Sequence, residues 1–138
     1  MNADGEKSYL RQELTRQIIA AAFDVSNTLG CGFLEKVYEN ALVVELRRRG
    51  LRVTQQLPIH VVYRNETVGQ YVADLVVENA VLVEVKATLE NDPVHVAQTL
   101  NYLRATRLPV GLLINFNVEH LRDGIFRIID PRRDLTQR

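Results

Sequence analysis

The sequence predicts an α/β domain in which a mixed β-sheet of about five strands is flanked by helices. Three observations support this prediction. Apolar residues recur with a helical period in the first third of the chain, segments rich in β-branched residues fill the middle third, and one helix followed by two strands fills the last third. Three hairpin-connected strands followed by a helical crossover require antiparallel and parallel neighbours in one sheet.

The first helix is predicted from an apolar stripe, with Ser8 as its N-cap and with Gly30 and Gly32 at its end. The members of the stripe recur every three or four residues: Leu10, Leu14, Ile18, Ala22, Val25 and Leu29. This spacing lays the stripe along one side of the helix, where it can face the core.

The second helix is expected to begin around Phe33 and to end at residues 47–49, just before Gly50. The residues expected on or beside its inner face are Leu34, Val37, Tyr38, Ala41, Leu42 and Glu45. The three arginines at its end are interpreted as basic residues that complement the negative end of the helix dipole, in preference to a phosphate-binding patch.

Strands follow over residues 53–63, 67–78 and 81–86. The first of them is rich in β-branched and aromatic residues, and Pro58 indicates an edge strand or a bulge. Residues 64–66 form the turn between the first two strands. The three strands are therefore expected to pair as consecutive hairpins.

The last third begins with a helix that runs to about Arg107, with Asp92 as its N-cap and Pro93 at its first position. Residues 109–116 are almost wholly apolar, which predicts a strand buried on both faces. A final strand is expected over residues 125–129.

Composition limits the function. The chain has 138 residues, 17 basic and 17 acidic side chains, and one cysteine. We expect one domain over residues 1–138, with a core at about 8–130 and frayed ends. The lone thiol excludes a disulfide framework and a cysteine zinc site. The polar first residues and the lack of a long apolar run predict a cytoplasmic protein without a membrane partner, and zero net charge excludes coating of nucleic acid through one broad basic face.

Charged side chains interrupt two of the predicted strands. Glu84 and Lys86 share one face of the strand 81–86, because side chains two residues apart point the same way. Asp74 lies among apolar residues in the preceding strand. Such residues are costly inside a sheet and therefore indicate a candidate site.

The hairpin loop decides whether the two acids meet. A three-residue loop over 78–80 would place Asp74 opposite Glu84 and Val72 opposite Lys86, whereas a two-residue loop would put the acids on opposite faces. We favour the three-residue loop because carboxylates paired at about 5 Å between Cβ atoms repel each other unless a cation lies between them. This choice uses an assumed function to select a register.

Two interpretations fit this charge pattern. Lys86 can neutralise one acid in a buried ion pair, which stabilises a protein little. Alternatively, two acids against one base leave an excess of negative charge, which a hard cation such as Mg²⁺ or Mn²⁺ selects. Spacing alone favours neither interpretation.

Several ordered motifs carry a resemblance to a known family. Residues 32–38 match the pattern Gly-x-x-Glu-x-x-Tyr, and further matching segments follow at 71–75, 83–87, 98–103 and 111–116. Over about residues 18–129, the chain resembles the GxxExxY protein family within the PD-(D/E)XK nuclease-like superfamily. The resemblance implies a restriction-endonuclease-like fold.

The resemblance also implies a catalytic site. Asp74 and Glu84 would bind a divalent metal, Glu35 would complete the acidic cluster, and Lys86 would stabilise the scissile phosphate or orient the attacking water. Gln98 would match the superfamily's polar residue near the active site. The same comparison places Ala73, before Asp74, where the superfamily usually has a proline that contributes no ligand.

Tyr102 and Arg104 are the expected substrate contacts, from the same helix as Gln98. Simpler roles remain open: Gln98 as an exposed helix residue, Tyr102 as a core aromatic residue, and Glu35 as an acid favoured by the helix dipole. His95 is not favoured as a base. Cys31 is expected to be a small buried residue.

The function predicted from the sequence is metal-dependent hydrolysis of phosphodiester bonds in nucleic acid, with Mg²⁺ or Mn²⁺ as the cofactor. DNA is favoured over RNA, and a homodimer is expected because a small domain needs a second copy to span a duplex. The alternative is a catalytically weak nucleic-acid or protein-binding module that retains the nuclease-like fold. Zero net charge motivates this alternative.

Overall fold

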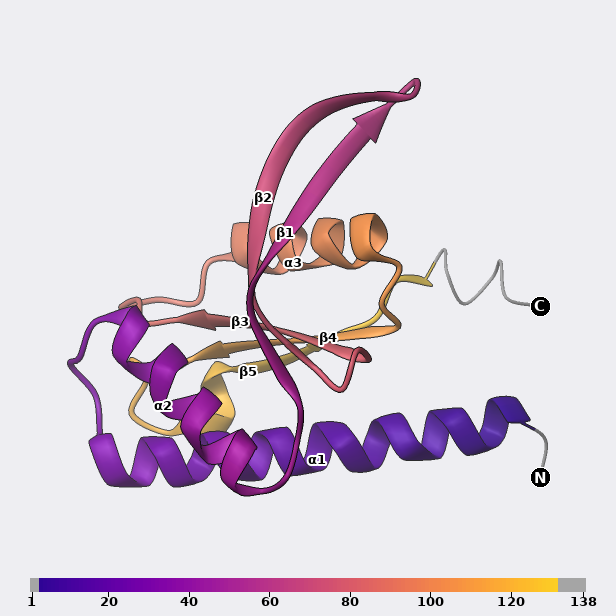
Figure 1. Cartoon of the computed structure of the whole chain (residues 1–138). Coiled ribbons are helices and arrows are strands. Elements are labelled where there is room, and N and C mark those ends of the chain that lie inside the picture. Colours follow the sequence, from indigo (N-terminus) through magenta and orange to yellow (C-terminus); the bar gives the residue numbers. More distant parts are fainter. Residues whose placement is uncertain (1–2, 132–138) are drawn as a thin grey trace.

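The computed structural model describes residues 3–131 and has the predicted α/β architecture, with a five-stranded mixed sheet flanked by helices (Figure 1). The element order also agrees: α1 (Ala3–Leu29), α2 (Glu35–Arg48), β1 (Val53–Tyr63), β2 (Glu66–Val77), β3 (Val81–Lys86), α3 (Pro93–Thr106), β4 (Val110–Asn115), the short 3₁₀ helix η1 (Leu121–Gly124) and β5 (Ile125–Ile128). Within residues 3–131, no helix combines the length and the apolar character that crossing a membrane requires.

The sheet has the strand order β1-β2-β3-β4-β5, so neighbours in sequence are also neighbours in space. The β3–β4 pair is parallel, and the other three pairs are antiparallel. A parallel pair needs a long connection, and α3 supplies it. The predicted mixed sheet with a helical crossover is therefore confirmed.

Helices cover both faces of this sheet (Figure 1). On one face, α1 and α2 pack over a core that includes Ile18, Tyr38, Leu42, Val83 and Ile114. On the other face, α3 packs over a second core that includes Ala73, Leu82, Tyr102, Leu103 and Leu113. Because successive strand residues point to opposite faces, β4 is buried along its whole length and β3 up to its last residue.

Two predictions about the first helices are wrong. Ser8 does not cap α1, because that helix begins at Ala3 and Ser8 lies inside it. The inner face of α2 is also rotated relative to the expected stripe, and its buried residues are Tyr38, Glu39, Leu42, Val43 and Leu46. Leu34, by contrast, is 81% exposed. The apolar pattern missed this face because one of its members is a buried glutamate with polar partners on β1.

The predicted ends of α3 are confirmed. The Asp92 side chain accepts a hydrogen bond from the Val94 N–H (3.0 Å), and Pro93 occupies the first turn. Arg107 closes the other end in a left-handed conformation with φ 61°, and its N–H donates to the Leu103 carbonyl (2.8 Å).

The basic end of α2 also fits its simpler interpretation. Arg47 and Arg48 lie in the last turn, where they complement the helix dipole. Arg49 donates hydrogen bonds to Asp24 on α1 and to Glu45 (3.0 Å), so it ties the two helices together.

β1 and β2 continue beyond the sheet as a two-stranded arm, residues 57–73, which extends past α3 (Figure 1). The two strands pair with each other along most of their length, whereas the β2–β3 ladder is short. Pro58 lies on β1, at the edge of the sheet, as predicted, and the register shifts between Val61 and Val62. The β1–β2 arm therefore separates from β3, and the place beyond Leu75 and Val83 where the two backbones diverge is called the opening.

Candidate active site

The β2–β3 hairpin has the register predicted from a three-residue loop. Its ladder ends at the pair Leu75 and Val83, so the next positions outward are Asp74 and Glu84. At that point the strands separate. The two acids therefore lie where paired backbone gives way to an opening.

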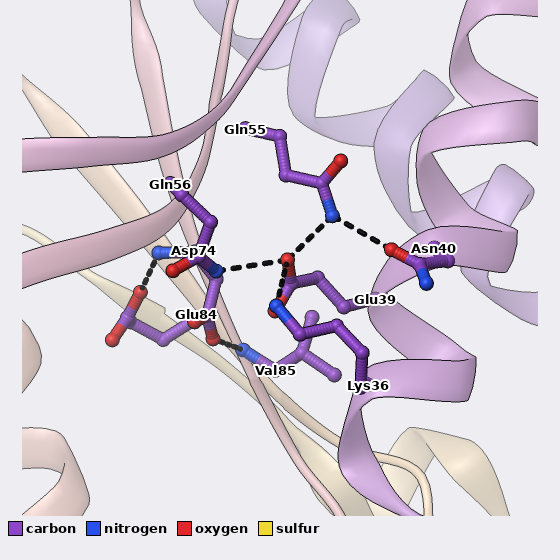
Figure 2. A network of polar contacts seen from close by, with 8 residues as sticks. All are labelled: Lys36, Glu39, Asn40, Gln55, Gln56, Asp74, Glu84 and Val85. Carbon is purple, nitrogen blue, oxygen red and sulfur yellow. Dashed lines mark hydrogen bonds and ion pairs between the residues drawn. The ribbon is translucent and has the colours of Figure 1, made fainter.

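The two acidic side chains replace the missing ladder bonds (Figure 2). The Asp74 N–H donates to Oε2 of Glu84 (2.7 Å), and the Val85 N–H donates to Oδ2 of Asp74 (2.8 Å). Each carboxylate thus satisfies a backbone donor that strand separation leaves without a carbonyl partner. This reciprocal contact holds both acids at the opening and explains why they tolerate their buried positions.

Burial shifts both carboxyl groups strongly. Desolvation, together with the charges of Glu39 and Glu35, raises the pKa of Asp74 to about 6 against the opposing effects of the Val85 N–H and Lys86. Glu84 is only 4% exposed, and desolvation followed by repulsion from Asp74 raises its pKa to about 8. Strongly shifted carboxyl groups at the edge of an opening are typical of functional sites.

Lys86 lies two residues beyond Glu84, and its charge lowers the pKa of both Glu84 and Asp74. The predicted pairing of Lys86 with Val72 is wrong, because the β2–β3 ladder ends before it reaches them. Lys86 instead lines a cavity of about 370 Å³ near the start of α3. Lys86 therefore acts electrostatically on both acids and also lines this cavity.

Asn115 organises the segment after Lys86. It is buried, its Nδ2 donates to the Thr88 carbonyl (3.1 Å) and to Oδ1 of Asn91 (3.0 Å), and its Oδ1 accepts from the Thr88 N–H (3.1 Å). Asn115 is paired with Lys86 across the parallel strands. The end of β4 thus positions the wall of the cavity beside Lys86.

Glu35 is the first residue of α2 and is partly buried. Its charge contributes to the raised pKa of Asp74 and of Glu84. The motif around it has a clear structural basis. Gly32 has φ +106°, which favours glycine, and the Tyr38 hydroxyl donates to the Gly30 carbonyl (2.5 Å) and accepts from the Phe33 N–H (3.2 Å).

The ring of Tyr38 stacks on Phe116 with 4.8 Å between centroids, which anchors the start of α2 to the end of β4. Glycine, glutamate and tyrosine in this spacing therefore shape the turn before α2 and present Glu35 at its first position.

Glu39 is an acidic residue that the sequence prediction missed. It is 2% exposed, and its Oε2 accepts hydrogen bonds from Gln55 (2.6 Å), Gln56 (2.9 Å) and Lys36 (3.1 Å) (Figure 2). Its charge contributes to the raised pKa of Asp74. The sequence does indicate its burial, because Glu39 lies three residues before Leu42 and so shares its helix face.

Gln55 and Gln56 reach the same carboxylate although neighbours in a strand normally point to opposite faces. Gln56 has φ 58°, a left-handed conformation, and this turns its side chain toward Glu39. The β1–β2 pairing passes over Gln56, which stands opposite Asp74. The kink in β1 therefore coincides with the place where β2 leaves β3.

The donor set of Asp74 and Glu84 fits a hard divalent cation, because such ions select carboxylate oxygens. The hydrogen bonds described above use Oδ2 of Asp74 and Oε2 of Glu84 and do not involve Oδ1 or Oε1. Among residues 3–131, no three His, Cys, Asp or Glu side chains gather closely enough to hold one ion. The structure therefore builds two adjacent carboxylates, while Glu35 stays a predicted third ligand.

The predicted residues of α3 lie along a groove next to the site. Gln98, Tyr102 and Arg104 line a space of about 800 Å³ between α3 and the β1–β2 arm. Burial, followed by the charges of Glu84, Tyr71 and Asp74, raises the pKa of Tyr102, and its ring packs in the same core cluster as Ala73, the residue before Asp74. Arg104 Nε lies 3.4 Å from Oδ1 of Asp130.

The structure also places His95 and Cys31, neither of which is expected to take part in catalysis. His95 lines the cavity beside Lys86, and its carbonyl accepts the Thr99 hydroxyl (2.8 Å). Cys31 was expected to be buried but is exposed, because the glycine turn before α2 carries it to the surface, where its Sγ lies 3.2 Å from the Val118 carbonyl oxygen.

Fold and site together define an α/β domain with an acidic site at a strand divergence. A family model of the PD-(D/E)XK nuclease superfamily matches residues 12–128. The chain therefore belongs to this superfamily, whose nucleases generally use divalent metal ions. Neither the curated proteins nor the solved structures include a significant match.

Proposed function

We propose that the protein is a member of the GxxExxY family that hydrolyses phosphodiester bonds of nucleic acid with the help of Mg²⁺ or Mn²⁺. The observation that carries this proposal is the reciprocal Asp74–Glu84 contact beside Lys86. Superfamily membership supports a nucleic-acid substrate. Burial makes two such carboxylates costly, and neutralisation by a bound cation would offset that cost.

Each residue has a role in this proposal. Asp74 and Glu84, joined by Glu35, would hold the ion, which lowers the pKa of bound water and neutralises charge on the phosphate. Lys86 would place its ammonium group against the negative charge that develops on the phosphate oxygens. Gln98 would orient the substrate from α3.

The decisive experiment measures cleavage of labelled DNA and RNA in Mg²⁺ and in Mn²⁺. Asp74→Asn and Lys86→Ala are each expected to lower the cleavage rate at least about 100-fold, because each removes electrostatic stabilisation of the transition state. Glu66→Gln is the matched control, since Glu66 is an exposed carboxylate on the same strand as Asp74. Full activity of Asp74→Asn or of Lys86→Ala would contradict the proposal, provided that circular dichroism shows an intact fold.

The second candidate function is a nucleic-acid or protein-binding module without efficient catalysis. Balanced charge, 17 basic against 17 acidic side chains, favours it because a substrate-binding surface would be expected to be basic. Calorimetric titration with Mn²⁺ separates the two. Binding that disappears in Glu84→Gln supports the nuclease, and no binding at millimolar metal supports the module.

We propose further that residues 1–138 act as one domain in the cytoplasm, as a homodimer, and on DNA in preference to RNA. The size of the chain supports the dimer, because one small domain covers little of a duplex and two-fold symmetry is the commonest oligomeric arrangement. The substrate panel above measures the preference for DNA.

A further inference from the structure

A groove lies between α3 and the β1–β2 arm, next to the acidic pair. Its volume is about 800 Å³, and residues of both elements line it, including His60, Tyr71, Asn101, Tyr102 and Arg107. Pockets of roughly 300–1,000 Å³ enclose molecules of drug size. The groove therefore has room for one or two nucleotides and not for a duplex.

The charged residues of the groove favour an anion. Arg104, Arg107 and His60 line it, and none of its lining residues is an aspartate or a glutamate. Arg104 is partly exposed and contacts Asp130, whereas Arg107 is exposed at the C-terminal cap of α3. Two guanidinium groups on one side of the groove provide donors that match phosphate oxygens in geometry and charge.

Two tyrosines provide an aromatic surface in the same groove. The rings of Tyr71 and Tyr102 are 5.7 Å apart and tilted by 45°. Tyr102 is 7% exposed and supports Tyr71, which is 49% exposed. Gly69 adds no side chain beside the ring, since a Cβ there would lie 3.5 Å from Cε2 of Tyr71. An exposed, supported ring is suited to stacking with a planar group.

The groove also meets the site of the proposed reaction. Tyr102 packs in the same core cluster as Ala73, which directly precedes Asp74 on β2, so the aromatic pair lies close to the segment of β2 that carries this acid. A strand that follows the groove would thus lead from the arginines to the acidic pair. In a duplex, neighbouring bases cover both faces of each base, and only an unpaired base can stack on Tyr71.

We propose that this groove binds an unpaired segment of a nucleic-acid strand, with one base stacked on Tyr71 and its phosphates next to Arg104 and Arg107. This inference rests on the proposed function, because it names the form of the substrate that reaches the acidic pair. It assigns a specificity role to Tyr71 and Arg107, which lie outside the acidic cluster.

The test measures fluorescence anisotropy of a labelled 12-nucleotide DNA strand, alone or in a duplex, with the full chain. The buffer contains Ca²⁺ in one series and EDTA in another, so that binding is observed without Mg²⁺ or Mn²⁺. We expect the single strand to bind at least about fivefold more tightly than the duplex in at least one series. Tyr71→Ala is expected to weaken single-strand binding at least about fivefold, and Tyr71→Phe to restore it.

Tyr63→Ala is the matched control, because Tyr63 is an exposed tyrosine on the same arm that does not line the groove. Arg107→Gln is expected to weaken binding, and Arg48→Gln, at the exposed end of α2, to leave it unchanged. Equal losses in Tyr71→Ala and Tyr63→Ala would overturn the inference. The inference would also be overturned if the duplex bound as tightly as the single strand, or if the single strand bound in neither buffer. Binding of a poly-glutamate peptide as tight as that of the single strand would overturn it as well.

These results are separable from the proposed function. If Asp74→Asn retains cleavage while Tyr71-dependent binding of the single strand is observed, the proposed hydrolysis fails and the groove inference stands. If cleavage depends on Asp74 but binding does not depend on Tyr71, the reverse holds.

Discussion

At the scale of single residues, Asp74 and Glu84 oppose the stability of the fold that brings them together. Each is held by a backbone N–H, yet burial raises the pKa of both carboxyl groups. Glu39, which has three side-chain donors, shows how the same helix–sheet interface satisfies a buried acid. The contrast is between an acid that three donors satisfy and a pair of carboxyl groups whose ionisation is opposed by burial and by their mutual repulsion.

The raised pKa values predict how stability depends on pH. Asp74 changes from 3.8 to about 6 and Glu84 from 4.5 to about 8, so between about pH 4 and pH 8 the folded chain binds more protons than the unfolded chain. The free energy of unfolding of the metal-free protein should therefore fall as pH rises through this window, by about 2 kcal/mol or more. Urea denaturation in EDTA at several pH values measures this slope.

Glu84→Gln is expected to flatten that slope and to be more stable than the wild type at the alkaline end, because it removes a carboxyl group that must ionise while buried. Glu66→Gln should retain the wild-type slope. The raised pKa values would be contradicted if the free energy of unfolding of the wild type rose between about pH 4 and pH 8, with the same slope as that of Glu84→Gln.

Glu39 should matter mainly for stability. Glu39→Ala removes an acceptor that is shared by Gln55, Gln56 and Lys36 and leaves Gln55 with Asn40 alone, and it is expected to lower the free energy of unfolding by about 1–3 kcal/mol. Glu45→Ala on the same helix breaks a more exposed ion pair with Arg49 and should cost less than about 1 kcal/mol. Urea denaturation compares the two variants, and similar losses would show that the Glu39 contacts add little.

At the scale of elements, β2 has to serve two partners. It pairs with β3 only up to Leu75, while its pairing with β1 continues along the arm. The left-handed Gln56 lies where the two paths separate, and the opening that results contains both acids. The site is therefore a consequence of strand divergence, and the same divergence creates one wall of the groove beside α3.

The packing of η1 against the end of β4 can be tested at Gly124, the last residue of η1. A Cβ at Gly124 would lie 2.3 Å from the Asn115 carbonyl oxygen, so Gly124→Ala must displace the backbone that positions the wall beside Lys86. We expect it to lower the free energy of unfolding by about 2 kcal/mol or more. Gly69→Ala, where the nearest contact is 3.5 Å, should change stability by less than about 1 kcal/mol. Equal effects in thermal denaturation would count against this packing argument.

At the scale of the whole molecule, the net charge of zero combines an acidic region with a basic one. The acids Glu35, Asp74 and Glu84 act on one another at the opening, and the adjacent groove is lined by arginines and a histidine. Such a distribution favours a focused site for a phosphodiester over a broad nucleic-acid-binding face.

The proposed homodimer is the prediction at this scale. Size-exclusion chromatography with light scattering should give twice the mass of one chain at micromolar concentration. A mass of one chain at all accessible concentrations would contradict the dimer and would leave the proposed metal site unaffected.

Much of this protein follows from short-range sequence patterns. Alternation and helical spacing gave the element order and most boundaries, and Asp92 and Pro93 gave the start of α3. The β2–β3 register agrees with the one favoured from the sequence, but that choice relied on an assumed cation between the two acids. These signals act between residues close in sequence, where backbone geometry and solvent exposure dominate. The meeting of Asp74 and Glu84 follows once the hairpin has a three-residue loop, because the loop length sets which residues stand opposite each other.

Only the tertiary structure decided where paired backbone ends and which polar groups are buried together. The face of α2 that contains Glu39, the kink at Gln56 and the exposed ring of Tyr71 all depend on how β1 and β2 leave the sheet, and no local period encodes that departure. Local sequence patterns specify the elements and place the two acids on neighbouring strands, whereas the loop that brings the acids together is one of two that these patterns allow. The separation of β2 from β3 around the pair and the groove beside it depend on packing between segments far apart in the chain. Burial of one face of a segment there determines the course of the segment packed against it.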